Sequence, residues 1–214
     1  KLTEESVVLS NDIQRMHDSQ FVFTEDRDYA DYIYLKSDLS TLKGKKFQSK
    51  RNHINRFRNT YPDYEYTPIT PDRIQECLDL EAEWCKVNNC DQQEGTGNER
   101  RALIYALHNF EALGLTGGIL HVNSKIVAFT FGMPINHETF GVHVEKADTN
   151  IEGAYAMINY EFANRIPEQY IYINREEDLG IEGLRKAKLS YQPVIVLEKY
   201  MACLKDTPVD PVKW

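Results

Sequence analysis

The chain has 214 residues, of which 42% are hydrophobic, and its 33 acidic side chains against 25 lysines and arginines give a net charge of −8. This length and apolar content suffice for one core with a small appendage, and the negative charge argues against a DNA-coating protein. No apolar stretch approaches the roughly 18 residues of a membrane helix, and no signal peptide opens the sequence. We therefore expect a cytoplasmic protein, peripheral to a membrane at most, with a local binding site and no DNA partner.

A basic segment interrupts the acidic background between residues 43 and 58. It contains no acid, and its basic residues are Lys43, Lys45, Lys46, Lys50, Arg51, Arg56 and Arg58. Grouped like charges repel one another, so the segment favours a site for an anion such as a phosphate, a nucleic acid or a lipid headgroup. The candidate anion ligands are Lys46, Lys50, Arg51 and Arg58. The alternative is a solvated helix face that binds nothing.

The basic segment is predicted to be helical, because Phe47, Ile54 and Phe57 recur on one face. Ser40 or Thr41 would cap this helix, and Pro62 would end it. The four cysteines contain no C-x-x-C pair and have no histidine at metal-ligand spacing, so we expect reduced thiols and no metal site. The G-x-S-x-G, G-x-x-x-x-G-K and G-x-G-x-x-G motifs are absent, which removes the commonest hydrolase, NTPase and dinucleotide-binding classes.

The remaining elements alternate between strands and helices. We predict a strand at 64–70, a helix from Pro71 through Cys85, a loop at 88–98 and a second helix closed by Gly114. A meander of three strands follows at 118–122, 126–134 and 139–146. A helix at 153–166, a strand at 170–174, a helix at 182–190 and a strand at 194–200 complete the series. This order predicts an α+β fold, a mixed sheet flanked by helices.

The order resembles the GCN5-related N-acyltransferase fold. The resemblance implies that the strands at 139–146 and 170–174 splay apart and hold an acyl donor between them. It also implies a loop with the pattern Gln/Arg-x-x-Gly-x-Gly/Ala, whose amides bind the coenzyme A pyrophosphate at the start of the next helix. In the corresponding stretch, 150–155, only Gly153 matches as a cofactor ligand, and Glu152 and Tyr155 are poor neighbours for a pyrophosphate. We therefore predict no cofactor, with coenzyme A as the alternative.

Local motifs carry a closer resemblance. The runs at 50–54, 144–148 and 174–180, and the Leu-Arg-x-x-Lys…Pro pattern at 184–193, resemble the C-terminal domain of phosphatidylglycerol lysyltransferases and its soluble, uncharacterised relatives. The likeness covers residues 42–200. Members of the wider family contain two such modules in tandem. This implies a remnant of, or linker from, a preceding module at 1–38, an acyltransferase-like domain at 39–205 and an extended tail at 206–214.

The resemblance implies an aminoacyl or acyl transferase. Its donor would be a charged tRNA, and its acceptor a lipid headgroup, a peptide or a small amine. The phosphates of the tRNA would contact the basic segment together with Arg185 and Lys188, provided that both share one groove. An acyl-coenzyme A-dependent N-acyltransferase and a non-catalytic binding module of the same fold are the alternatives.

The candidate catalytic residues are Glu145, His143, Arg175 and Tyr191. Glu145 and Arg175 lie near the ends of the two splaying strands, and strand alternation places His143 on the same side as Glu145. Glu145 could act as a base or hold an acceptor amine, or it could form a structural ion pair with Arg175 or Lys146. Tyr191 lies where enzymes of the fold place a tyrosine that protonates the leaving group. The acids after Arg175 are expected to pair with the basic residues of 185–188 or to bind an ammonium group.

Overall fold

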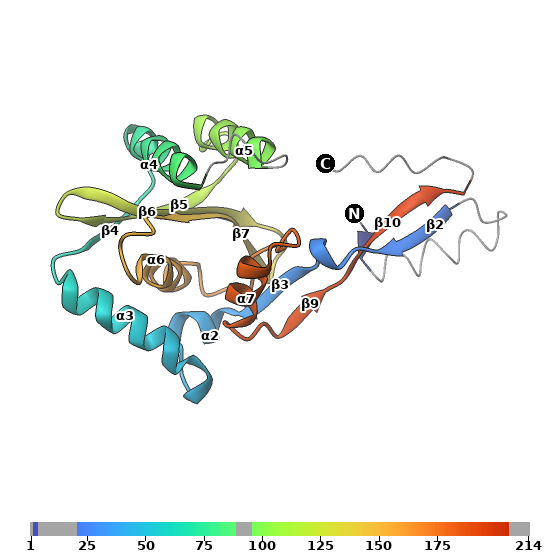
Figure 1. Cartoon of the computed structure of the whole chain (residues 1–214), viewed down its shortest axis with the longest axis horizontal. Helices are drawn as coiled ribbons and strands as arrows, with labels where there is room; N and C mark the ends of the chain where they lie inside the picture. The colour runs from blue at the N-terminus through green and yellow to red at the C-terminus, as the bar shows by residue number, and fades with distance from the viewer. Residues whose placement is uncertain (1, 4–20, 89–95, 206–214) are drawn as a thin grey trace. The chain divides into compact units, whose positions relative to one another are not determined.

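The computed structural model describes residues 2–3, 21–88 and 96–205 (Figure 1). Its α-helices are α2 (Lys36–Thr41), α3 (Gln48–Thr60), α4 (Ile74–Asn88), α5 (Thr96–His108), α6 (Ala154–Ala163) and α7 (Glu182–Leu189). Its strands are β1 (Leu2–Thr3), β2 (Phe21–Glu25), β3 (Asp31–Leu35), β4 (Glu65–Pro68), β5 (Thr116–Val122), β6 (Lys125–Pro134), β7 (Thr139–Ala147), β8 (Tyr172–Asn174), β9 (Ile195–Leu197) and β10 (Lys199–Leu204). Short 3-10 helices lie at Arg27–Tyr29, Lys45–Phe47 and Pro71–Arg73.

The strands form two sheets. The larger sheet has the order β4-β5-β6-β7-β8-β3-β9, and the smaller has the order β1-β10-β2. Strands β4 to β7 are the predicted antiparallel meander, extended by the strand before it. Asn123 and Ser124, between β5 and β6, both have positive φ, which suits the tight hairpin turn expected there. The predicted α+β architecture, a mixed sheet flanked by helices, is confirmed.

The chain divides into two compact units. The larger unit is residues 35–173, and the smaller unit is residues 1–34 with 174–214. The division falls within β3 and within β8, so each unit is described by itself. The domain boundaries expected from the sequence, after residues 38 and 205, stay a prediction. The tail at 206–214 lies outside the described residues.

The core of the larger unit lies on one face of β5, β6 and β7. Ile119 pairs in register with Phe129, so both side chains point to the same face, and Phe131 joins them two residues further on. They pack against buried side chains of α4 and α5, among them Cys77, Leu80, Leu103 and Leu107. Helix α6 covers the other face of these strands, and α3 lies beyond α6 (Figure 1).

The basic segment forms a helix, as predicted, but the start of that helix differs from the prediction. Helix α3 begins at Gln48, whereas Ser40 and Thr41, the predicted caps, belong to α2. Leu42 ends α2 in the left-handed conformation, with φ 48, and Gly44, with φ 92, turns the chain toward α3. The turn at residues 42–44 separates both hydroxyls from the first amides of α3, so they cannot cap it.

The last predicted strand, at 194–200, is two strands in the structure. Strand β9 pairs with β3 in the larger sheet, and β10 pairs with β2 and β1 in the smaller one. The strand pattern predicted the extended backbone correctly. It contained no signal for the change of partner, because the partners lie far away in the sequence.

Helix α6 begins where the chain passes close to α3. Gly153, at the N-cap of α6, has φ +86, a left-handed conformation that glycine adopts at little cost. A Cβ atom at this position would lie 2.8 Å from the carbonyl oxygen of His53 and 3.1 Å from the Cβ of Phe57. Both the backbone conformation and the lack of space therefore require glycine.

We predict that Gly153→Ala lowers the free energy of unfolding by about 1–3 kcal/mol, because it forces a strained φ and a backbone clash. Gly183→Ala is the matched control, since a Cβ there meets nothing within 4 Å and alanine favours the helix by about 0.5–1 kcal/mol. Urea denaturation of the two variants measures the difference. Equal stability of both variants would contradict the packing described for α6.

Candidate functional site

Strand β7 carries two of the predicted site residues, His143 and Glu145. The register pairs Val142 and Val144 with two consecutive residues of β6, so these two valines point to opposite faces of the sheet. His143 is consequently the extra residue of a β-bulge, a feature that often lies next to functional sites. The bulge breaks the simple alternation from which we expected His143 and Glu145 to share one side.

Glu145 faces α6. It pairs in register with Thr130, on the face opposite to the one with Phe129 and Phe131. Its Oε2 accepts a hydrogen bond from Nδ2 of Asn159, a buried residue of α6, at 3.2 Å. The Glu145 side chain is half-buried, so the carboxylate is oriented by a rigid element and still reaches the surface.

Lys146 faces α4 and α5 on the other side. Its Nζ lies 3.0 Å from Oε1 of Glu99 and 3.7 Å from the centroid of the Trp84 ring. The buried ammonium group is therefore held by an ion pair and a cation–π contact. Lys146 thus pairs with Glu99, on the face of the sheet opposite to the one where Glu145 lies.

Glu81 of α4 is a buried carboxylate close to Lys146. It is 2% exposed, and its Oε2 has no hydrogen-bond partner in the described part of the chain. Burial raises the pKa of Glu81, and the charge of Lys146 only partly opposes that effect. A buried carboxyl group with a raised pKa and an unused oxygen is typical of functional sites.

Tyr155, in the first turn of α6, connects these groups. Its hydroxyl accepts a hydrogen bond from Nε1 of Trp84 at 3.0 Å. Burial raises the pKa of Tyr155, and the nearby carboxylates of Glu145 and Glu81 raise it further. The structure thus gathers six side chains around the end of β7. We call them the β7 cluster, which consists of Glu81, Trp84, Glu145, Lys146, Tyr155 and Asn159.

A pocket of about 150 Å³ opens beside the β7 cluster. Leu80, Trp84 and Val87 of α4 form one wall, and Asp148 and Asn150 of the loop after β7 form the other. Ligand pockets usually exceed about 300 Å³. The opening therefore accommodates one small group, such as an amine, and not a whole substrate.

The smaller unit brings two further predicted residues together. The guanidinium carbon of Arg175, just after β8, lies 4.8 Å from the centroid of the Tyr191 ring and 5.7 Å from that of Tyr34. The two rings meet edge to face at 6.5 Å. Tyr191 is 6% exposed. The guanidinium group of Arg175 therefore makes cation–π contacts with both rings.

Lys188 of α7 supports the backbone around Arg175. Its Nζ donates to three consecutive carbonyl oxygens, those of Arg175, Glu176 and Glu177. Glu176 has φ 55, a left-handed conformation that turns these carbonyls toward one donor. The charge of Lys188, predicted to bind an external anion, thus contributes to the folding of this loop.

Arg185 of α7, which is partly exposed, pairs with the buried carboxylate of Asp178. Its Nε and Nη2 donate to the two carboxylate oxygens at 2.8 and 2.9 Å, and Nη2 also reaches Asp28 at 2.7 Å. Burial would raise the pKa of Asp178, but hydrogen bonds from Arg185, Tyr32 and the Gly180 amide outweigh burial and lower it to about 2. The expected pairing of the acids after β8 with the basic residues of α7 is confirmed for this pair.

Candidate anion ligands of the basic segment also have partners inside the larger unit. Nζ of Lys46 lies 2.8 Å from Asp38, and Arg51 donates to carbonyl oxygens at the end of α2. Nη2 of Arg58 lies 3.6 Å from Glu161. Much of this charge therefore stabilises the packing of α2, α3 and α6.

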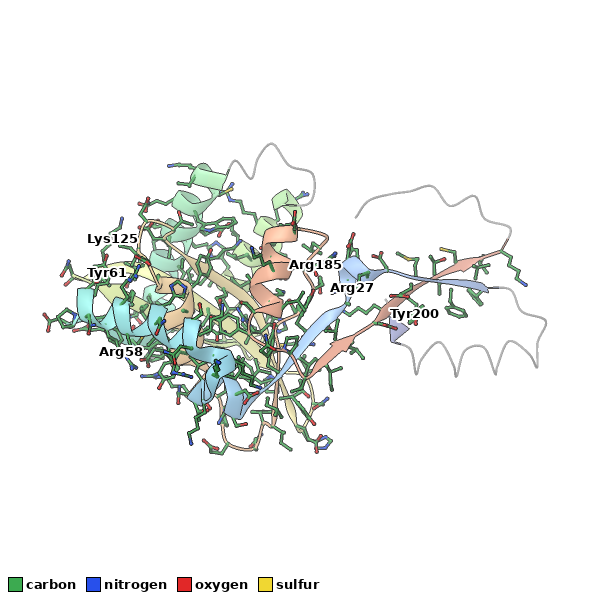
Figure 2. The ribbon with its side chains drawn as sticks, turned by 60° about the horizontal axis from the view of Figure 1, so that its bottom comes forward. Arg27, Arg58, Tyr61, Lys125, Arg185 and Tyr200 are labelled. Atoms are coloured by element: carbon green, nitrogen blue, oxygen red, sulfur yellow. The ribbon has the colours of Figure 1, made fainter. Side chains whose placement is uncertain are left out.

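The outer part of the basic segment remains the better candidate for an anion site. Lys43 and Lys45 are exposed in the turn before α3, and Lys50 is half-buried on the helix. Figure 2 shows the same helix with Arg58 labelled. Helix α3 belongs to the larger unit and α7 to the smaller one. Their predicted convergence on one groove stays a prediction.

The loop before α6 differs from a pyrophosphate loop in its contacts as well as in its sequence. Glu152 forms an ion pair with Arg56 of α3. The adjacent Gly153 packs against the carbonyl oxygen of His53, as described above. The start of α6 is thus bordered by an acidic side chain and a backbone carbonyl, both of which repel phosphate oxygens.

Sequence reasoning missed four members of the β7 cluster. Glu81 could have been found, because it lies seven residues after Ile74 on the apolar stripe of α4, where a carboxylate is out of place. Trp84 and Asn159 give no such signal. Tyr155 was considered only as a poor neighbour for a pyrophosphate.

The described residues do not meet the requirements of a metal site, a disulfide or a membrane helix. There, no group of three or more His, Cys, Asp or Glu side chains could hold a metal ion. Cys77, Cys85 and Cys203 are free thiols, as predicted, and Cys90 lies outside the described residues. None of the described helices has the length and apolar character needed to cross a membrane.

The mixed sheet flanked by helices has an acyltransferase-like fold. Residues 7–203 match the sequence model of the family "Phosphatidylglycerol lysyltransferase, C-terminal". This match covers most of the chain, and the protein belongs to that family.

Solved structures share the fold of this chain. A conserved protein of unknown function from Bacteroides thetaiotaomicron is 87% identical, with a TM-score of 0.89 over 95% of this chain and 68% of that one. The C-terminal domain of a putative lysylphosphatidylglycerol synthetase from Agrobacterium fabrum shares the fold at 13% identity, with a TM-score of 0.68 over 94% of this chain and 65% of that one. L-PGS from Bacillus licheniformis does so at 16% identity, with a TM-score of 0.62 over 95% of this chain and 66% of that one.

A curated relative also extends beyond this chain. An uncharacterised protein of Mycoplasmoides gallisepticum is 24% identical over 196 residues, which are 89% of this chain and 58% of the relative. The chain thus spans less than two thirds of the length of that protein.

We predict that Asp178→Asn lowers the free energy of unfolding at pH 7 by about 2 kcal/mol, because the folded pKa lies roughly two units below that of an unfolded aspartate. A carboxyl group whose pKa is lower in the folded state stabilises the fold at pH values above its unfolded pKa. The contribution of Asp178 is therefore present above about pH 4 and is lost as the pH falls toward 2. Urea denaturation at pH 7 and pH 2.5 measures it. Asp28→Asn, which alters an exposed partner of the same Arg185, should cost less. A difference between wild type and Asp178→Asn that does not shrink at low pH would contradict the pairing of Asp178 with Arg185.

Proposed function

We propose that this chain is the transfer domain of an aminoacyltransferase. It takes an aminoacyl group from the 3′ end of a charged tRNA and transfers it to a hydroxyl or amine acceptor, which is a lipid headgroup, a peptide or a small amine. The family's name, which describes transfer of a lysyl group to phosphatidylglycerol, supports this class of reaction. The alternatives are an acyl-coenzyme A-dependent N-acyltransferase and a binding module without activity.

The position of Glu145 is the observation that carries the proposal. An acceptor hydroxyl or amine loses a proton as it attacks an ester, and a carboxylate within hydrogen-bond distance can take that proton. Asn159 orients the carboxylate of Glu145, and the side chain is half-buried at the end of β7. An aminoacyl ester is already activated, so the domain needs little more than positioning, a base and hydrogen-bond donors.

The start of α6 favours a tRNA ester over coenzyme A as the donor. The carboxylate of Glu152 and the carbonyl oxygen of His53 border the place where a pyrophosphate would bind. A tRNA makes its phosphate contacts along an extended surface instead, for which the exposed lysines before α3 are suited. This comparison supports charged tRNA as the donor.

We predict that the protein binds aminoacyl-tRNA in a salt-sensitive manner and does not bind acetyl-coenzyme A. Fluorescence titration with each ligand at 50 mM and 200 mM salt tests both statements, and affinity for tRNA should fall steeply with salt. Lys43→Ala with Lys45→Ala should weaken tRNA binding. Lys86→Ala with Lys205→Ala removes two charges elsewhere and should not. Saturable coenzyme A binding with indifference to tRNA would instead favour the N-acyltransferase.

We also predict that Glu145→Gln reduces the rate of aminoacyl transfer about 10²–10⁴-fold, as expected for loss of a general base, and leaves tRNA affinity unchanged. The assay follows loss of the aminoacyl ester from tRNA with phosphatidylglycerol vesicles, a peptide amine or a small amine as acceptor. Glu111→Gln, a change to an exposed residue after α5, is the control. A fully active Glu145→Gln protein would refute the role of this residue. An absence of transfer to any acceptor by wild type would favour the binding module.

A further inference from the structure

The hydroxyl oxygen of Tyr155 is the acceptor of a hydrogen bond. The donor is Nε1 of Trp84 at 3.0 Å, and an indole nitrogen can only donate. The backbone of Ala147 also acts to lower the pKa of Tyr155, as a nearby donor does. Because the hydroxyl accepts from Trp84, its own hydrogen is left to donate.

Tyr155 is 37% exposed as a residue, so part of its side chain reaches the surface. Asn159 follows it by four residues, so the two side chains share one face of α6, and Asn159 is the residue that holds Glu145. The side chain of Tyr155 therefore projects from the same face of α6 as Asn159, which holds the proposed base.

The surroundings suit a group that gives up a proton only during a reaction. Burial and the two nearby carboxylates raise the pKa of Tyr155, so the proton stays in place at neutral pH. When the proton leaves, the N–H group of Trp84 already donates to the oxygen that becomes charged. Preorganised donors of this kind stabilise a developing anion without further rearrangement.

We infer that Tyr155 is the general acid of the transfer reaction, the residue that protonates the leaving oxygen of the donor ester. This inference rests on the proposed function and adds a residue to it. It also differs from the sequence-based expectation, which gave that role to Tyr191. Tyr191 is buried beside Arg175 in the smaller unit, whereas Tyr155 belongs to the β7 cluster.

Two side chains, those of Glu145 and Tyr155, carry out all proton transfers of the proposed reaction. The acceptor oxygen or nitrogen forms a bond to the ester carbonyl carbon, and its proton passes to the carboxylate of Glu145. The bond from that carbon to the ribose oxygen then breaks, and its electron pair stays on the oxygen. Tyr155 gives its proton to this oxygen, which leaves as a hydroxyl group. The resulting phenolate recovers a proton from the carboxylic acid of Glu145.

The test compares two donors that differ in their need for an acid. A lysyl ester of the 3′-hydroxyl of adenosine releases a strongly basic alkoxide, whereas a lysyl 4-nitrophenyl ester releases a weak base that needs no proton. Single-turnover rates are measured at saturating donor for the full chain, with the acceptor that supports transfer from tRNA. The variants are Tyr155→Phe, Trp84→Phe and the control Tyr105→Phe, which removes the hydroxyl of an exposed tyrosine of α5.

We expect Tyr155→Phe to slow transfer from the adenosine ester about 10²–10⁴-fold and to leave transfer from the nitrophenyl ester nearly unchanged. The second rate also shows that the variant is folded. Trp84→Phe, which keeps the tyrosine but removes one N–H donor, should cause a smaller loss that is again confined to the adenosine ester. Tyr105→Phe should match wild type with both donors.

Two results overturn the inference and leave the proposed function standing. These are an unchanged rate of Tyr155→Phe with the adenosine ester, and an equal loss with both donors, which would indicate a structural role. Failure of wild type to transfer the lysyl group from charged tRNA itself, assayed beside the two esters, would instead remove the proposed function, and the inference with it.

Discussion

One extra residue in β7 determines which side chains meet which helices. Up to Val142 the strand alternates in step with β6. After the bulge at His143, each residue points to the face opposite to the one that uninterrupted alternation would give it. Glu145 is thereby directed to α6, where Asn159 binds it, and Lys146 to α4 and α5. Without the extra residue, Glu145 would point toward the apolar side chains around Phe129. A carboxylate without partners there would cost several kcal/mol. The bulge is thus a condition for both the core and the polar cluster.

Many basic residues of this protein make contacts that stabilise the fold. The basic segment looks like a free anion-binding face in the sequence, yet Arg51 closes the end of α2, Arg56 pairs with Glu152, and Arg58 lies close to Glu161. The same holds for α7, whose Lys188 and Arg185 hold the loop after β8. Charge segregation along a sequence therefore indicates where charges are concentrated, and only the three-dimensional partners reveal how many remain for a ligand.

The limits of the sequence-based prediction follow from the range of the interactions involved. The meander, the helices α3 to α6 apart from the start of α3, and the pairing of Asp178 with α7 depend on local periodicity, turn residues and short loops, and these were predicted correctly. The bulge in β7 depends on register with another strand, and the change of β10 to a second sheet depends on partners about 180 residues away. The contact of Trp84 with Tyr155 joins positions 71 residues apart. Neither residue differs locally from an ordinary aromatic residue, so no sequence pattern could have paired them.

The place of Trp84 has a practical consequence. The chain contains two tryptophans, Trp84 and Trp214. The indole ring of Trp84 has an ammonium group against one face and a phenol at its nitrogen, and it forms part of the wall of a pocket. A charge so close to the ring shifts the energy of its excited state, so the fluorescence emission wavelength of Trp84 depends on Lys146 and Tyr155. With Trp214 replaced by phenylalanine, the chain would carry its own optical reporter at the β7 cluster, without any attached dye.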